Sequence, residues 1–126
     1  MKGLSREDSS LIGFAVDCRG ASAISFEEFI EWCFYMINQY DNLPTYMYYL
    51  VDCKNLSEVR ETIGFNVSPK MSEKESEAIW GIAAKRGVDI EDIYEGIITK
   101  KKALKRLEQY PHIEKRFRET FPFIKL

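Results

Sequence analysis

Two helix-start signals constrain the fold of this chain more than any other feature of its sequence. Ser25 is followed three residues later by Glu28, and Ser72 by Glu75, so each pair has the Ser-x-x-Glu spacing of a capping box. After each pair, apolar residues recur with the helical period of 3.6 residues rather than with the alternation of a strand. The sequence therefore predicts an amphipathic helix directly after each of the two serines.

The rest of the chain carries further start and stop signals of helices. We expect additional helices to begin at or near the capping residues Ser5, Asp89 and Thr99 and the prolines Pro44 and Pro111, and a further helix to run from about Leu56 to Ile63. A brief strand pairing of Val67 with Ile97-Ile98 is the weaker alternative. The chain of 126 residues suits one domain. We therefore predict an all-α fold, a single compact domain of six to eight short helices over residues 1–126.

The helical stripes also predict which side chains form the core. On the helix after Ser25, the apolar face is expected to bury four residues, and three more come from later helices. The expected core residues are Phe29, Ile30, Cys33, Ile37, Ile79, Ile82 and Leu107. Gly13 and Gly81 lie inside predicted helices, where glycine costs about 1 kcal/mol relative to alanine. Close packing of another helix against each glycine is the expected reason.

The number and spacing of the cysteines and the histidine indicate the redox compartment of the protein and limit its possible metal chemistry. The three cysteines are odd in number and form no Cys-x-x-Cys pair, which favours reduced thiols in the cytoplasm. Cys18 and Cys33 lie on apolar stripes, so we expect buried structural thiols there. With a single histidine, His112, a zinc cage is not expected, and no cofactor is predicted. The longest apolar runs have six residues against the ~20 of a membrane span, and no apolar signal core follows Met1.

Charge is divided unevenly along the chain. Residues 1–99 hold nine basic and 17 acidic side chains, a net of −8, whereas residues 100–126 hold nine basic and three acidic side chains, a net of +6. The overall charge of −2 hides this division. Either the two regions are ordinary solvated surfaces that pack beside each other, or one of them is a docking surface for an oppositely charged partner.

Two acidic clusters are candidate docking surfaces. On the solvent side of the helix after Ser25, three carboxylates surround a tyrosine: Glu27, Glu28, Glu31 and Tyr35. A rigid aromatic anchor within a charged field is typical of an interface hot spot. A second cluster comprises Asp89, Glu91, Asp92 and Glu95. The alternative interpretation is that these residues form an ordinary helix surface.

A basic cluster supports a second function. Lys101, Lys102, Lys105 and Arg106 share the outward arc of a predicted helix, as phosphate-binding residues of a nucleic-acid regulator would. Glu108 interrupts this arc, and no aromatic side chains suited to base stacking lie on it. An enzyme ranks third, because the chain lacks a P-loop, a dinucleotide fingerprint, a nucleophile elbow and a zinc-protease motif. A Cys–His pair or a carboxylate site would be required instead.

Two segments of the second half resemble a known group of proteins. The segments GIAAKRG, over residues 81–87, and PHIEKRFRETFPFI, over residues 111–124, resemble the immunity proteins of bacterial contact-dependent inhibition and related polymorphic toxin systems. The resemblance covers about a third of the chain. It implies a small cytoplasmic protein, not an enzyme, that binds one toxin domain, often a basic nuclease, and blocks it. It assigns no functional residue and leaves the oligomeric state open.

Overall fold

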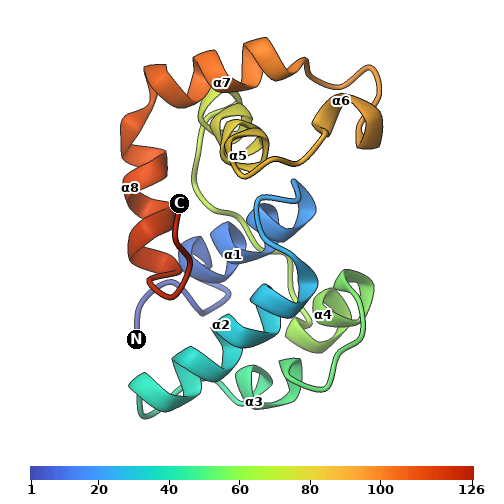
Figure 1. The fold of residues 1–126 in the computed structure, drawn as a ribbon. Helices are drawn as coiled ribbons and strands as arrows, with labels where there is room; N and C mark the ends of the chain where they lie inside the picture. The colour runs from blue at the N-terminus through green and yellow to red at the C-terminus, as the bar shows by residue number, and fades with distance from the viewer. The chain divides into compact units, whose positions relative to one another are not determined.

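The computed structural model describes residues 1–126 and contains eight α-helices and no strand (Figure 1). The predicted all-α fold of six to eight short helices is confirmed. The chain divides into two compact units: unit 1 comprises residues 1–20 and 24–70, and unit 2 comprises residues 21–23 and 71–126. Each unit is described separately below, and the single domain over residues 1–126 stays a prediction.

Unit 1 contains four helices, which are α1 (Ser10–Gly20), α2 (Phe26–Gln39), α3 (Tyr46–Leu50) and α4 (Leu56–Ile63). The capping box predicted before α2 is formed: Ser25 Oγ accepts the N–H of Glu28 at 3.0 Å, and Glu28 Oε1 accepts the N–H of Ser25 at 2.8 Å. The side chain of Asn55 caps α4, which ends at Gly64 with a left-handed φ of 80°. Local sequence signals thus set the bounds of these helices.

The start of α1 differs from the sequence prediction. Ser5 does not cap the helix but closes a turn, in which its Oγ accepts the N–H of Asp8 at 3.2 Å. The carboxylate of Asp8 in turn accepts the N–H of Ser10 at 3.1 Å, at the first residue of α1. A carboxylate near a helix start satisfies an otherwise unbonded N–H and opposes the helix dipole. The helix therefore begins at Ser10, after Asp8, and not directly after Ser5 as predicted.

The buried face of α2 is rotated from the one predicted. Phe29 and Cys33 are buried as expected, but Ile30 and Ile37 are only half-buried. Met36, which lies on the predicted apolar face, is buried, and Trp32, which was not assigned to the core, is fully buried as well. Burying an indole removes more apolar surface from water than burying an isoleucine does. The helix consequently turns toward its tryptophan, and the prediction was wrong for the two isoleucines.

Unit 2 contains the other four helices, which are α5 (Glu73–Lys85), α6 (Ile90–Ile93), α7 (Lys100–Gln109) and α8 (Pro111–Thr120). Each has the start signal expected from the sequence: the Ser72 capping box, the Asp89 side chain, the Thr99 hydroxyl and a proline at the first helical residue. The most extensive helix contact is that of α7 with α5. In Figure 1, the chain turns a corner between α7 and α8, and α8 also packs against α5.

Close packing explains the two glycines inside helices. A Cβ built on Gly81 would collide with the carbonyl oxygen of Ala103 and would lie 2.8 Å from Leu107 Cβ, so α7 approaches α5 at this residue. A Cβ on Gly13 would lie 2.5 Å from the carbonyl carbon of Ser68. The expected close packing of a helix is therefore confirmed at Gly81, but it is wrong at Gly13, where the close neighbour is the loop at Ser68. Of the expected core, Ile79, Ile82 and Leu107 are buried as well.

Candidate functional site

The outer face of α2 exposes only part of the first predicted cluster. Glu27 and Glu31 are exposed, and neither forms an ion pair. Phe34 follows three residues after Glu31 and is 50% exposed. Residues spaced by four and then three positions lie on one side of a helix. Two carboxylates and an exposed phenylalanine therefore share the outer face of α2.

The other two predicted residues of that cluster are placed differently. Glu28 is half-buried, and its carboxylate belongs to the capping box of α2. Tyr35, expected to point outward, is half-buried. Phe34 thus has the exposure that was expected of Tyr35. The spacing of Phe34 from Glu27 and Glu31 is the sequence signal that could have identified it.

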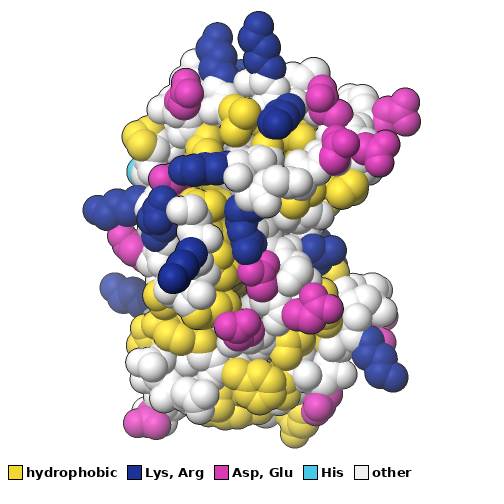
Figure 2. Space-filling view, viewed as in Figure 1, with side chains coloured by type: hydrophobic (Ala, Val, Ile, Leu, Met, Phe, Trp, Pro, Cys, Tyr) yellow, Lys and Arg dark blue, Asp and Glu magenta, His cyan; other side chains and the backbone are white.

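The second predicted cluster lies at α6. Asp89 Oδ1 accepts the N–H of Asp92 at 3.2 Å and so caps this short helix. Glu91, Asp92 and Glu95 are exposed, and no basic side chain pairs with them. Figure 2 shows acidic side chains gathered over α6. The structure therefore brings all four predicted carboxylates into one region whose negative charge is not neutralised by ion pairs.

Two exposed isoleucines accompany these carboxylates. Ile93 is 56% exposed and Ile97 is 64% exposed, and both lie within the same short segment as the acids. Sequence reasoning missed them, because isoleucine is among the residues most often buried. A shallow groove of about 400 Å³ is lined by Ile97 together with Glu91, Glu95 and Thr99, and also by Lys102, whose ammonium group pairs with Glu77. Apolar and acidic side chains are thus exposed together on this segment.

The predicted basic cluster on α7 is divided by ion pairs. Lys101 and Lys105 are exposed, and Figure 2 shows basic side chains standing out from α7. Lys102 Nζ lies 3.2 Å from one carboxylate oxygen of Glu77, and Arg106 Nε donates to the other at 2.9 Å. Burial raises the pKa of Glu77, but the bonds from Arg106 and Lys102 outweigh that effect and lower it overall. Two of the four basic residues therefore join α7 to α5.

The single histidine is engaged in a similar contact. His112 Nε2 pairs with the carboxylate of Glu75, so that α8 is joined to α5. This bond, followed by the bond from the N–H of Ser72, lowers the pKa of Glu75 from 4.5 to about 2. Burial raises the pKa of the Cys33 thiol to about 12, which keeps that thiol protonated. No three or more His, Cys, Asp or Glu side chains are grouped so that they could hold a metal ion.

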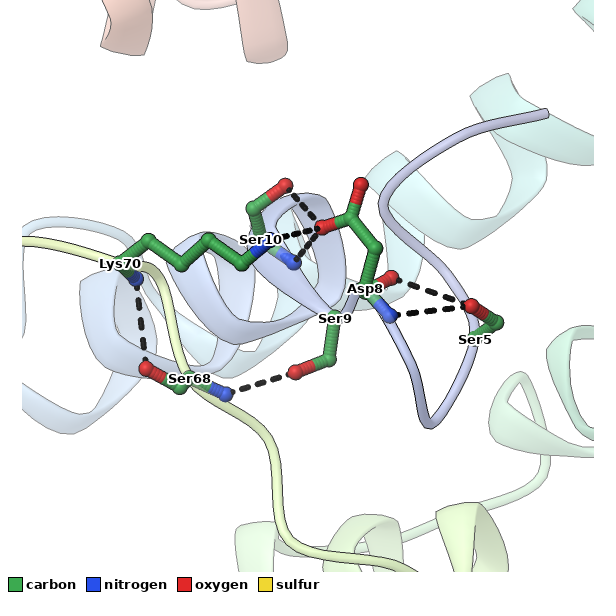
Figure 3. Close-up of polar contacts among 6 residues, drawn as sticks. All are labelled: Ser5, Asp8, Ser9, Ser10, Ser68 and Lys70. Atoms are coloured by element: carbon green, nitrogen blue, oxygen red, sulfur yellow. Dashed lines mark hydrogen bonds and ion pairs between the residues drawn. The ribbon is translucent and has the colours of Figure 1, made fainter.

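A polar network lies at the start of α1. Figure 3 shows Ser9 Oγ accepting the N–H of Ser68 at 2.9 Å, and Lys70 Nζ lies 3.2 Å from the Asp8 carboxylate. The bonds from Ser10, followed by that from Lys70, lower the pKa of Asp8. Every hydroxyl in these contacts bonds to backbone or to the carboxylate. The network therefore fastens the loop after α4 to the start of α1.

The comparisons with known proteins return nothing. Neither a protein-family model, nor a curated protein, nor a solved structure matches the chain. Among the eight helices, none is both long enough and apolar enough to cross a membrane.

Proposed function

We propose that this protein is the immunity partner of a bacterial toxin and that it acts in the cytoplasm by binding a basic toxin domain of the nuclease class. One observation supports this proposal above the others. The carboxylates of α6 and of the outer face of α2 have no basic partner, whereas Glu77 and Glu114 are paired with lysine and arginine side chains. The unpaired negative charge is thus available to a partner.

The chemistry of a nuclease explains why such a surface would inhibit it. A nuclease cleft binds a polyanion and is therefore basic. Carboxylates held on a helix can occupy the positions that phosphates would take in that cleft. Opposite potentials accelerate the encounter, and exposed apolar anchors such as Phe34, Ile93 and Ile97 slow dissociation. Both kinds of group are present on the two acidic surfaces.

The ion pairs of α7 weaken the alternative of a nucleic-acid regulator. Lys102 and Arg106 already contact Glu77, so only Lys101 and Lys105 of the basic cluster point to solvent without a partner. Two exposed lysines supply little of the charge that phosphate binding requires, and the chain is acidic overall. We expect no measurable affinity for duplex DNA or RNA at physiological salt.

A protection assay tests the proposed function. The toxin domain encoded beside this gene is expressed in bacterial cells with and without the protein, and growth is measured. We expect wild type to restore growth, because the two proteins form a tight one-to-one complex. Charge-reversed pairs on the three surfaces then compare their roles: Glu27→Lys with Glu31→Lys, Asp92→Lys with Glu95→Lys, and Lys101→Glu with Lys105→Glu.

The outcomes separate the two functions. Under the proposal, at least one acidic pair weakens binding and slows association, with a smaller dependence on salt, while the Lys101 and Lys105 pair still protects cells. Absence of a toxin gene beside this one, or of protection by wild type, contradicts the proposal. Salt-sensitive binding to DNA that the lysine reversal abolishes would favour the nucleic-acid regulator instead.

A further inference from the structure

The segment from Asp89 to Thr99 is anchored in unit 2 by three residues spaced four positions apart: Ile90, Tyr94 and Ile98. Ile90 is 1% exposed and Ile98 is 7% exposed. Between them, the Tyr94 ring stands edge-on to the Trp80 ring with 4.2 Å between centroids, and its hydroxyl hydrogen-bonds to Ser22 Oγ. These three inward side chains fix the orientation of the whole segment.

This anchoring forces the intervening side chains outward. Ile93 and Ile97 each precede an anchoring residue, and they are 56% and 64% exposed. Their backbone is ordered by hydrogen bonds, since the N–H of Ile93 donates to Asp89 O at 3.2 Å and that of Ile97 to Tyr94 O at 3.0 Å. The exposure of the isoleucines is therefore a property of a formed structure, and binding would require little ordering of this segment.

The charges around the isoleucines determine which partner fits. We propose that Glu91, Asp92, Ile93, Glu95 and Ile97, here named the α6 surface, form the interface for a basic protein partner. An apolar side chain of the partner would contact the two isoleucines and the adjoining groove. Lysine or arginine side chains beside it would contact the three carboxylates. This inference rests on the proposed function and adds the location of its interface.

Other occupants fit the α6 surface less well. Nucleic acids and acidic lipid surfaces carry the same sign of charge as its three carboxylates and would be repelled. A second copy related by a twofold axis would place the same carboxylates opposite each other, because a twofold interface uses one patch on both subunits. A basic protein surface meets both the charge and the apolar requirement.

Synthetic peptides test this inference without knowledge of the toxin. The probe is a 14-residue peptide of leucine and lysine that forms a helix with one apolar face, titrated into the 15N-labelled full chain. We expect amide shifts confined to residues 89–99. A peptide with serine in place of leucine should bind at least about tenfold more weakly, and one with glutamate in place of lysine should not bind.

Matched variants assign the binding to named residues. Binding of the leucine–lysine peptide should weaken by about tenfold or more in each of two double variants. One is Ile93→Ser with Ile97→Ser, and the other is Asp92→Lys with Glu95→Lys. All four residues are exposed, and far-UV circular dichroism checks that the fold is kept. Glu27→Lys with Glu31→Lys on α2 serves as the control of equal charge change and should leave binding unaltered. Shifts centred on α2, or peptide binding that none of the α6 variants alters, would overturn the inference.

The toxin assay separates failure of this inference from failure of the proposed function. Full protection by Asp92→Lys with Glu95→Lys would refute the α6 surface as the interface while the immunity function stands. If wild type gives no protection, the immunity function fails, but peptide binding at residues 89–99 still supports a docking surface for a basic protein. Concentration-dependent self-association that Lys101→Glu with Lys105→Glu abolishes would assign the surface to a second copy and overturn the inference.

Discussion

Replacement of Gly81 by alanine should destabilise unit 2, although alanine is the better helix former. The added Cβ would collide with the backbone oxygen of Ala103 and lie 2.8 Å from Leu107 Cβ. Neither atom is the end of a flexible side chain, so α5 and α7 would have to move apart. Helix propensity favours alanine by about 1 kcal/mol, whereas overpacking costs about 1–3 kcal/mol. Because a backbone atom must give way, we expect a net loss of about 1–2 kcal/mol.

A second glycine provides the control for this substitution. At Gly20, in the last turn of α1, the nearest atom to an added Cβ is Leu56 Cδ2 at 4.0 Å. Gly20→Ala should therefore be neutral or slightly stabilising. Both variants are compared with wild type by urea unfolding followed by far-UV circular dichroism. A Gly81→Ala variant as stable as wild type would refute the argument that the helix contact requires glycine.

Two further predictions test the buried face of α2 and the contact between α5 and α8. Met36→Ala should lower the free energy of unfolding by about 2–5 kcal/mol, because Met36 is 2% exposed. Ile37→Ala should lower it by less than about 2 kcal/mol, because Ile37 is only half-buried. Equal losses of the two variants in urea unfolding would contradict the rotated face of α2. Because the pKa of Glu75 is lowered from 4.5 to about 2, its ionised form stabilises the folded chain above pH 4.5, and this contribution is lost as the pH falls toward 2. His112→Gln should reduce the loss of Tm between pH 4.5 and pH 2. A dependence of Tm on pH equal to that of wild type would count against the pairing of His112 with Glu75.

The helix bounds were predictable where both partners of a signal lie close together in the sequence. The two capping boxes and the Asp89 and Thr99 caps each join residues three positions apart, and all are formed. The rotation of α2 was not predictable in the same way. Apolar side chains such as Trp32 and Phe34 lie outside the predicted stripe of α2, so the pattern does not define one buried arc. Tertiary packing selects the arc that contains Trp32.

The candidate surfaces were predictable in composition but not in detail. Sequence patterns identified the carboxylates at α6, whose acids are close neighbours in the chain. They could not indicate that Lys102 and Arg106 bind Glu77, because those residues lie 25 and 29 positions apart and meet only when α7 packs on α5. They also could not indicate that Ile93 and Ile97 point outward, which depends on the anchoring of their neighbours.

Pairing distinguishes carboxylates that stabilise the fold from those available to a partner, and this distinction can be measured. The side chain of Glu77 is 18% exposed and contacts two cations, so Glu77→Gln should cost about 1.5–3 kcal/mol, the usual value for hydrogen bonds to charged groups. Glu95 is exposed, has no ion-pair partner and lies among other carboxylates, so Glu95→Gln should change the unfolding free energy by less than about 0.5 kcal/mol. Removal of one of several like charges can even stabilise the folded chain. If Glu95→Gln destabilises the protein as much as Glu77→Gln does in urea unfolding, then Glu95 has a structural role. The α6 carboxylates would in that case not be retained for a partner.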